Sequence, residues 1–254
     1  MFGIAPIGFA GERKAIALLV LAFYTALYSL MALLMANAPD HPELRAWWPC
    51  FASLAGCYGI GFFALGADWF WARWFAIGLG YSGLTLAGWG LFMQRAIEPM
   101  LLFYGITHGL VVLVLQGERL KAHFDAKPGW REKFHLDEAA ATKVRHTVTR
   151  AAASLPTLIM LALAPRDNPA GLALLAVATL GLLGVLRLRT WGILALGSAG
   201  LGGLGFVLGA APPSATQIIP GPLVHAAGLA ASAFLLLSVV PFFRPMVRFL
   251  AQRR

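Results

Sequence analysis

Charged residues are scarce in this sequence of 254 residues. Asp, Glu, Lys and Arg make up only 12% of it, and none lies in the cores of about eight apolar stretches of membrane-spanning length. Hydrophobic residues make up 59%, more than the polar surface of a water-soluble protein could cover. The chain is therefore predicted to be a polytopic membrane protein without the intramembrane carboxylates and amines that most membrane catalysts and ion-coupled carriers use.

Cysteine and the common catalytic motifs are scarce as well. Cys50 and Cys57 lie two helical turns apart in one apolar stretch, too far along a helix axis to form a disulfide. The sequence contains no Walker loop, no paired carboxylates, no His-Glu-x-x-His and no Cys-x-x-Cys. We therefore predict no catalytic residue and no metal site.

The basic residues predict an orientation. A net charge of +9 would suggest nucleic-acid binding in a soluble domain, but here the bases lie in the connections between apolar stretches, so the bilayer and not nucleic acid is the expected partner. With the N-terminus in the cytoplasm, all of the 20 Lys and Arg except Arg45, Arg95 and Arg166 are cytoplasmic. This bias, with an excess of Arg over Lys, predicts a bacterial inner-membrane protein with both termini in the cytoplasm.

The predicted fold is an all-α bundle of about eight transmembrane helices. Residues 151–165 are short for a span, which leaves two alternatives. Either residues 151–186 form a re-entrant hairpin, or a helix that starts near Asp137 continues through Arg150 and lengthens the fifth span. The eight predicted spans are residues 15–36, 46–67, 74–94, 99–116, 151–165, 170–186, 190–211 and 217–243.

An internal repeat divides the chain into two tandem four-helix halves, residues 1–116 and 151–254. An offset of 117 residues places Trp74 on Trp191 and His108 on His225. The two halves would have the same orientation and a pseudo-twofold axis along the membrane normal. Residues 117–150 form a basic cytoplasmic connection, interpreted as a topological anchor, with docking of a soluble partner or of anionic lipid headgroups as the alternative. The same offset places Gly80, Gly83 and Gly88 on Gly197, Gly200 and Gly205.

Two histidines, His108 and His225, lie inside predicted spans and at similar predicted depth. In the first interpretation each imidazole bonds a neighbouring helix and holds the bundle together. In the second, the two rings line a narrow path for a small uncharged solute or a proton. In the third, they are the axial ligands of a b-type haem, the only cofactor considered. The glycines expected to allow close helix packing are Gly105, Gly109, Gly197, Gly200 and Gly205.

One serine offers an enzymatic alternative. The string Gly80, Tyr81, Ser82, Gly83 resembles the Gly-x-Ser-Gly of rhomboid intramembrane serine proteases. The resemblance implies Ser82 as a nucleophile and a membrane histidine as its base. It covers four residues and a histidine, and none of the predicted outer loops contains the family's Trp-Arg.

These observations favour a non-enzymatic function. The chain is expected to be either a membrane-embedded subunit of a larger complex, bound to other membrane subunits or to copies of itself, or a passive conduit for a small neutral solute. A haem-bearing electron-transfer protein and a rhomboid-like protease are the alternatives.

Overall fold

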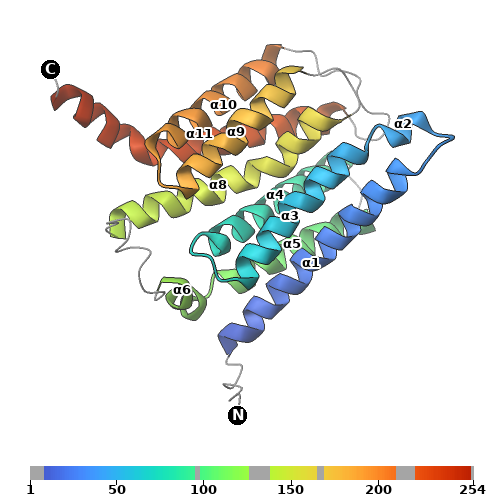
Figure 1. Ribbon diagram of the computed structural model, residues 1–254, viewed down its shortest axis with the longest axis horizontal. Helices are drawn as coiled ribbons and strands as arrows, with labels where there is room; N and C mark the ends of the chain where they lie inside the picture. The colour runs from blue at the N-terminus through green and yellow to red at the C-terminus, as the bar shows by residue number, and fades with distance from the viewer. Residues whose placement is uncertain (1–8, 95–97, 126–137, 165–168, 210–220, 253–254) are drawn as a thin grey trace.

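The computed structural model describes residues 9–94, 98–125, 138–164, 169–209 and 221–252, and in these ranges the regular structure is entirely α-helical (Figure 1). Eight helices are long, and two are short and lie in connections. The long helices are α1 (Phe9–Ala36), α3 (Trp48–Gly66), α4 (Ala72–Gln94), α5 (Pro99–Leu115), α8 (Glu138–Leu163), α9 (Pro169–Leu186), α10 (Thr190–Gly209) and α11 (Gly221–Gln252); the short ones are α2 (Pro42–Arg45) and α6 (Glu118–Asp125).

Local sequence explains where several helices begin. Proline occupies the first turn of α3 and α5, where its missing N–H costs no helical hydrogen bond. Glu98 caps α5, because its side chain accepts a hydrogen bond from the backbone N–H of Leu101 at 2.8 Å. Except between α5 and α8, the connections between consecutive long helices are short, so these helices run antiparallel.

The chain is a polytopic all-α membrane protein, as the sequence predicts. Within the described residues, six helices are long and apolar enough to cross a bilayer by length and composition, namely α1, α3, α4, α9, α10 and α11. Large apolar side chains such as Leu19, Phe63 and Phe92 are about 70% exposed on the outside of the bundle. Such a surface is suited to lipid and not to water.

The central helix, α8, resolves the two alternatives for residues 151–165. It is one continuous helix that begins at Glu138 and passes through Arg150, so the predicted lengthening is confirmed, even with Pro156 inside the helix. Most of its residues from Ala151 to Ala162 are buried against other helices. A helix that contacts protein on most sides can carry polar residues that a lipid-facing helix could not.

The long helices form two groups of four that lie side by side (Figure 1). In the first group α1 and α4 each pack on α3 and α5, and in the second α8 and α10 each pack on α9 and α11. The groups meet mainly where α4 packs on α8, with further contacts of α8 with α3 and of α4 with α11. The predicted pseudo-twofold axis would relate the contact of α4 with α8 to an equivalent contact of α10 with α1. In the described ranges, α1 and α10 are not among the helix pairs with substantial contact.

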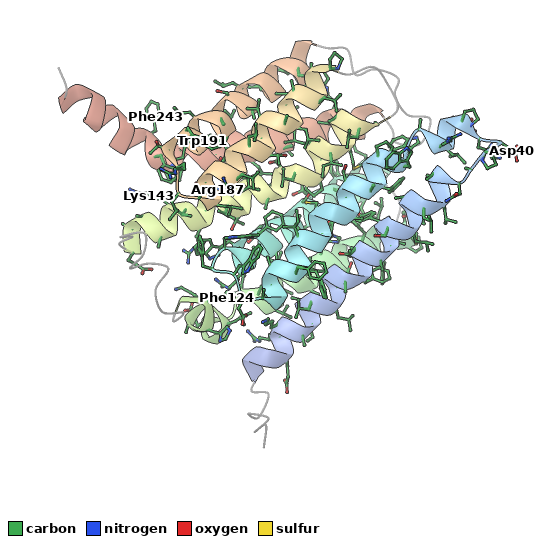
Figure 2. The ribbon with its side chains drawn as sticks, in the orientation of Figure 1. Asp40, Phe124, Lys143, Arg187, Trp191 and Phe243 are labelled. Atoms are coloured by element: carbon green, nitrogen blue, oxygen red, sulfur yellow. The ribbon has the colours of Figure 1, made fainter. Side chains whose placement is uncertain are left out.

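Basic side chains gather at one end of the bundle, where α1, α4 and α8 begin and α3, α5 and α9 end. We call this the basic end. Lys14 of α1 pairs there with Asp68 at 2.6 Å, and Figure 2 shows Lys143 and Arg187 on this side of the molecule and Asp40 at the opposite end. The structure thus brings together bases from connections that are far apart in the sequence.

Candidate functional site

His108 is buried at the centre of the first helix group, with 1% of its surface exposed. Its Nδ1 lies 2.8 Å from the carbonyl oxygen of Tyr104, and its Nε2 lies 2.7 Å from the hydroxyl of Tyr58. Because a carbonyl only accepts, Nδ1 carries the proton and Nε2 accepts from Tyr58. Both nitrogens of this imidazole are therefore engaged with protein groups.

A cluster of aromatic hydroxyls surrounds this ring. The ring centroids of Tyr24 and Tyr104 lie 4.5 Å and 4.1 Å from that of His108, and Tyr24 shares a hydrogen bond of 2.6 Å with Thr107. A Cβ on Gly83 of α4 would overlap the imidazole, so this glycine makes room for it. The arrangement links α1, α3 and α5 through satisfied polar groups, and α4 packs against the ring at Gly83, which fits the first interpretation of His108.

The structure does not bring His225 to His108. α5 packs on α4 and α1, whereas α11 packs on α8, α10 and α4. His225 is the fifth residue of α11, whereas His108 is the tenth residue of α5. In the described ranges the ring contacts of His108 are with Tyr24, Tyr58 and Tyr104, and as arranged His108 offers no nitrogen to a haem iron.

Helix register explains why the repeat did not predict this geometry. Gly83 faces His108, but its counterpart Gly200 faces Leu236, where a Cβ would lie 2.9 Å from Leu236 Cγ. Leu236 lies eleven residues beyond His225, so α10 and α11 pair in a register different from that of α4 and α5. Similar glycine spacing in two helices does not fix the register of their partners.

The predicted packing glycines differ in their surroundings. A Cβ on Gly105 would lie 3.0 Å from Ala87, and one on Gly109 would lie 3.3 Å from Leu84, so both sit in the close contact between α4 and α5. Gly200 sits in the contact between α10 and α11, where the nearest atom to a Cβ on Gly197 is Val239 Cγ2 at 3.5 Å. Gly205 has nothing within 4 Å of such an atom and lies on the outer face of α10.

Ser82 is 5% exposed and lines a small cavity of about 40 Å³ between α4, α8 and α11. Thr85 and Thr157 line the same cavity, and no histidine is among its described lining residues. No hydrogen bond joins Ser82 to a histidine within the described ranges. The geometry thus gives the predicted nucleophile no base in contact. The same ranges hold no group of three or more His, Cys, Asp or Glu placed to bind a metal ion.

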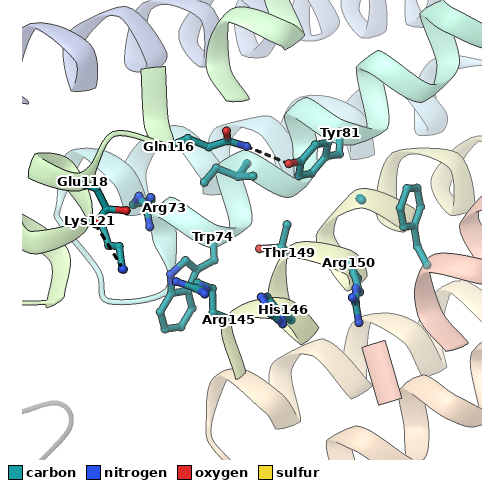
Figure 3. Close-up of a pocket in the computed structure, with 13 residues that line it drawn as sticks. Arg73, Trp74, Tyr81, Gln116, Glu118, Lys121, Arg145, His146, Thr149 and Arg150 are labelled. Atoms are coloured by element: carbon teal, nitrogen blue, oxygen red, sulfur yellow. Dashed lines mark hydrogen bonds and ion pairs between the residues drawn. The ribbon is translucent and has the colours of Figure 1, made fainter. Parts of the chain in front are cut away.

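A larger cavity of about 550 Å³ opens at the basic end between α4, α6, α8 and α11 (Figure 3). We call it the basic cavity. Five basic side chains line it, and Glu118 is the one acidic residue among its described lining residues. The basic side chains are Arg73 of α4, Lys121 of α6, and Arg145, His146 and Arg150 of α8.

Two of its arginines are held in place by backbone carbonyls. Arg73 is 5% exposed, and its Nε donates to the carbonyl of Leu115 at 2.6 Å, across the contact of α4 with the end of α5. Arg150 donates from a terminal nitrogen to the carbonyl of Leu237 in α11. A carbonyl partner fixes a guanidinium without itself adding a negative charge. Preorganised positive charge therefore faces this cavity.

The remaining lining groups determine its electrostatic balance. Lys121 lies 3.5 Å from Glu118, so one base is partly compensated by the one carboxylate. Partial desolvation lowers the pKa of the largely exposed His146, and the nearby Arg145 and Arg150 lower it further, so the surroundings of His146 disfavour its charged form. Gln116 donates to the hydroxyl of Tyr81 at 3.0 Å on the apolar side of the cavity. A cavity with this lining attracts anions, and its arginines match the geometry of phosphate or carboxylate.

The sequence contains a weak signal of this cavity. Arg73 directly precedes Trp74 at the start of a span, and Arg145 and Arg150 precede the fifth span, so each reads as a topological anchor when taken alone. Their convergence depends on the packing of α4 against α8, which no local pattern encodes. Comparison with known proteins adds no further assignment: no family model, no curated protein and no solved structure matches this chain.

Proposed function

We propose that this membrane protein is a non-enzymatic component of a bacterial inner membrane that binds an anionic group in the basic cavity. The observation that carries the proposal is the convergence of Arg73, Arg145 and Arg150 on one cavity, with Glu118 as the opposing charge. The ligand chemistry is a phosphate or a carboxylate, which guanidinium groups bind through paired N–H donors. Such a lining disfavours the neutral solute that the apolar composition suggests for a passive conduit.

A role as a subunit of a larger assembly is supported by the outer face of α10. Gly205 and Gly209 are exposed there with a small-xxx-small spacing, and neither has an atom within 4 Å of the position of a Cβ. This spacing allows a helix of another chain to approach closely in a bilayer. In this proposal the basic end faces the cytoplasm, because basic connections are retained on that side.

Native mass spectrometry of the protein purified in a mild nonionic detergent tests the proposal. We expect anionic adducts on the wild-type protein, fewer on Arg145→Gln, and wild-type levels on the control Lys143→Gln, which changes a base on the same helix outside the described lining. The same spectra detect bound protein chains. Adduct levels that are equal in the two variants would contradict the proposed site, and a haem absorption band would favour the electron-transfer alternative.

A further inference from the structure

The basic cavity continues into a groove along the outside of the bundle. Ala153 of α8 and Phe234 of α11 line both the basic cavity and the small cavity beside Ser82, so the two follow each other between α4, α8 and α11. α4 and α11 form the walls, and they contact each other far less than each contacts α8. Beyond Phe234 the charged lining ends. The residues there are Ser82, Thr85, Leu86, Trp89, Thr157, Ala226, Ala227, Ala230 and Ala231.

This groove opens to the surroundings of the bundle and not into a closed interior. Trp89 is 41% exposed, and Thr85 and Ala230 are half-buried, so its rim is accessible from the side. It lies along membrane-spanning helices, where the medium at that surface is lipid. From Tyr81 to Trp89 the groove follows α4 for about 12 Å, close to the ~15 Å depth of hydrocarbon in one leaflet.

We infer that the occupant is an anionic phospholipid of the leaflet at the basic end, with its phosphate in the basic cavity and one acyl chain along the α4–α8–α11 groove. This inference rests on the proposed function, because it names the source of the anionic group. Charge decreases along the site in the same order as in such a lipid, from Arg73, Arg145 and Arg150 to the alanines of α11. Basic pockets between transmembrane helices bind anionic headgroups in this way.

Two substitutions test the two parts of the site separately. Arg145→Gln removes a headgroup charge, and the control Lys143→Gln removes a charge outside the described lining. Ala230→Phe fills the groove, and the control Ala233→Phe places the same ring on an exposed position of α11. Arg145→Lys retains charge without the paired donors.

Binding is measured by native mass spectrometry of delipidated protein titrated with phosphatidylglycerol, with phosphatidylcholine of the same chains, and with glycerol phosphate. We expect phosphatidylglycerol to bind best, Arg145→Gln to weaken it about fivefold, and Ala230→Phe to weaken it without a change in headgroup preference. Both controls should bind like the wild type.

The outcomes separate this inference from the proposed function. Glycerol phosphate that binds as tightly as phosphatidylglycerol, with Ala230→Phe equal to Ala233→Phe, would overturn the lipid and leave an anion-binding cavity. No Arg145-dependent binding of any of the three compounds would overturn the lipid, and a further lack of Arg145-dependent anionic adducts on the protein as purified would overturn the proposed function as well. Folding of each variant is checked by its unfolding temperature without added lipid, and Arg145→Lys supplies a second headgroup variant should Arg145→Gln unfold. If Ala230→Phe weakens dimer formation and leaves the binding of phosphatidylglycerol unchanged, the groove is a contact between two copies of the chain and the lipid is overturned.

Discussion

The surroundings of His108 could be predicted only in part from the sequence. The position of His108 inside a span indicates a role in packing, but its partners Tyr58 and Tyr104 come from two helices. A hydrogen bond between residues that are 50 positions apart has no local signal. The interpretation that His108 holds neighbouring helices together fits the structure, whereas its pairing with His225 depended on a register that the sequence does not encode.

His146 at the edge of the basic cavity predicts a pH dependence of stability. Burial lowers its pKa below the usual 6.5, and Arg145 and Arg150 add to the effect. The unfolded chain then binds a proton more strongly than the folded protein, so this residue costs stability as the pH falls below about 6.5. When the pH is lowered from about 7.5 to about 5, we expect the unfolding temperature of His146→Gln to fall less than that of the wild type.

Tryptophan emission during heating measures this effect, since the chain contains 8 Trp. The control His41→Gln changes an exposed histidine at the opposite end of the bundle, away from these arginines. An acid-induced loss that is the same in His146→Gln and in the wild type would show that folding does not lower the pKa of His146.

Single helices were the most predictable level of this structure. The predicted span 99–116 corresponds to α5 at Pro99–Leu115, because polar residues and Pro99 border a continuous apolar run. α11 extends to Gln252, beyond the predicted end at residue 243, since basic residues outside a bilayer do not end a helix. The predicted start of this span, residues 217–220, lies outside the described residues. Pairing between helices was less predictable, because many small and apolar residues allow several registers.

The contact between α4 and α8 gives a prediction for the element that joins the two helix groups. A Cβ on Gly78 would overlap the carbonyl oxygen of Thr149 and lie 2.6 Å from the Cβ of Ala152. Both are rigid neighbours, so Gly78→Ala must push the helices apart, at a cost of about 1–3 kcal/mol. Gly88 of the same helix has nothing within 4 Å, and there the same substitution should be neutral or gain up to about 1 kcal/mol.

A thiol-reactive fluorophore detects this difference through the native cysteines, so no cysteine has to be introduced. Cys50 and Cys57 are free and buried, so they react when the bundle opens. We expect Gly78→Ala to lower the temperature of dye reaction and Gly88→Ala to leave it unchanged or raise it. Equal unfolding temperatures in the two variants would mean that α4 and α8 do not approach as closely as the structure shows.

The assembly of the whole molecule was the least predictable level. The apolar pattern predicts eight long helices, but the basic cavity is formed by Arg73, Lys121 and Arg145, which belong to three separate helices. Each residue follows the general bias of connections toward positive charge, so none stands out in the sequence. Their convergence follows from the way the two helix groups meet.

Orientation in the membrane is a prediction for the whole molecule, because all of its connections contribute to it. The basic end contains Lys14, Arg73 and Arg145, and the opposite end contains Asp40, so we expect the basic end in the cytoplasm. In spheroplasts, a membrane-impermeant maleimide should label Asp40→Cys directly and Ala139→Cys only after permeabilisation. Both positions are exposed, and the native cysteines are buried. Labelling of Ala139→Cys in sealed spheroplasts would reverse the orientation and would move the basic cavity, with its lipid, to the outer leaflet.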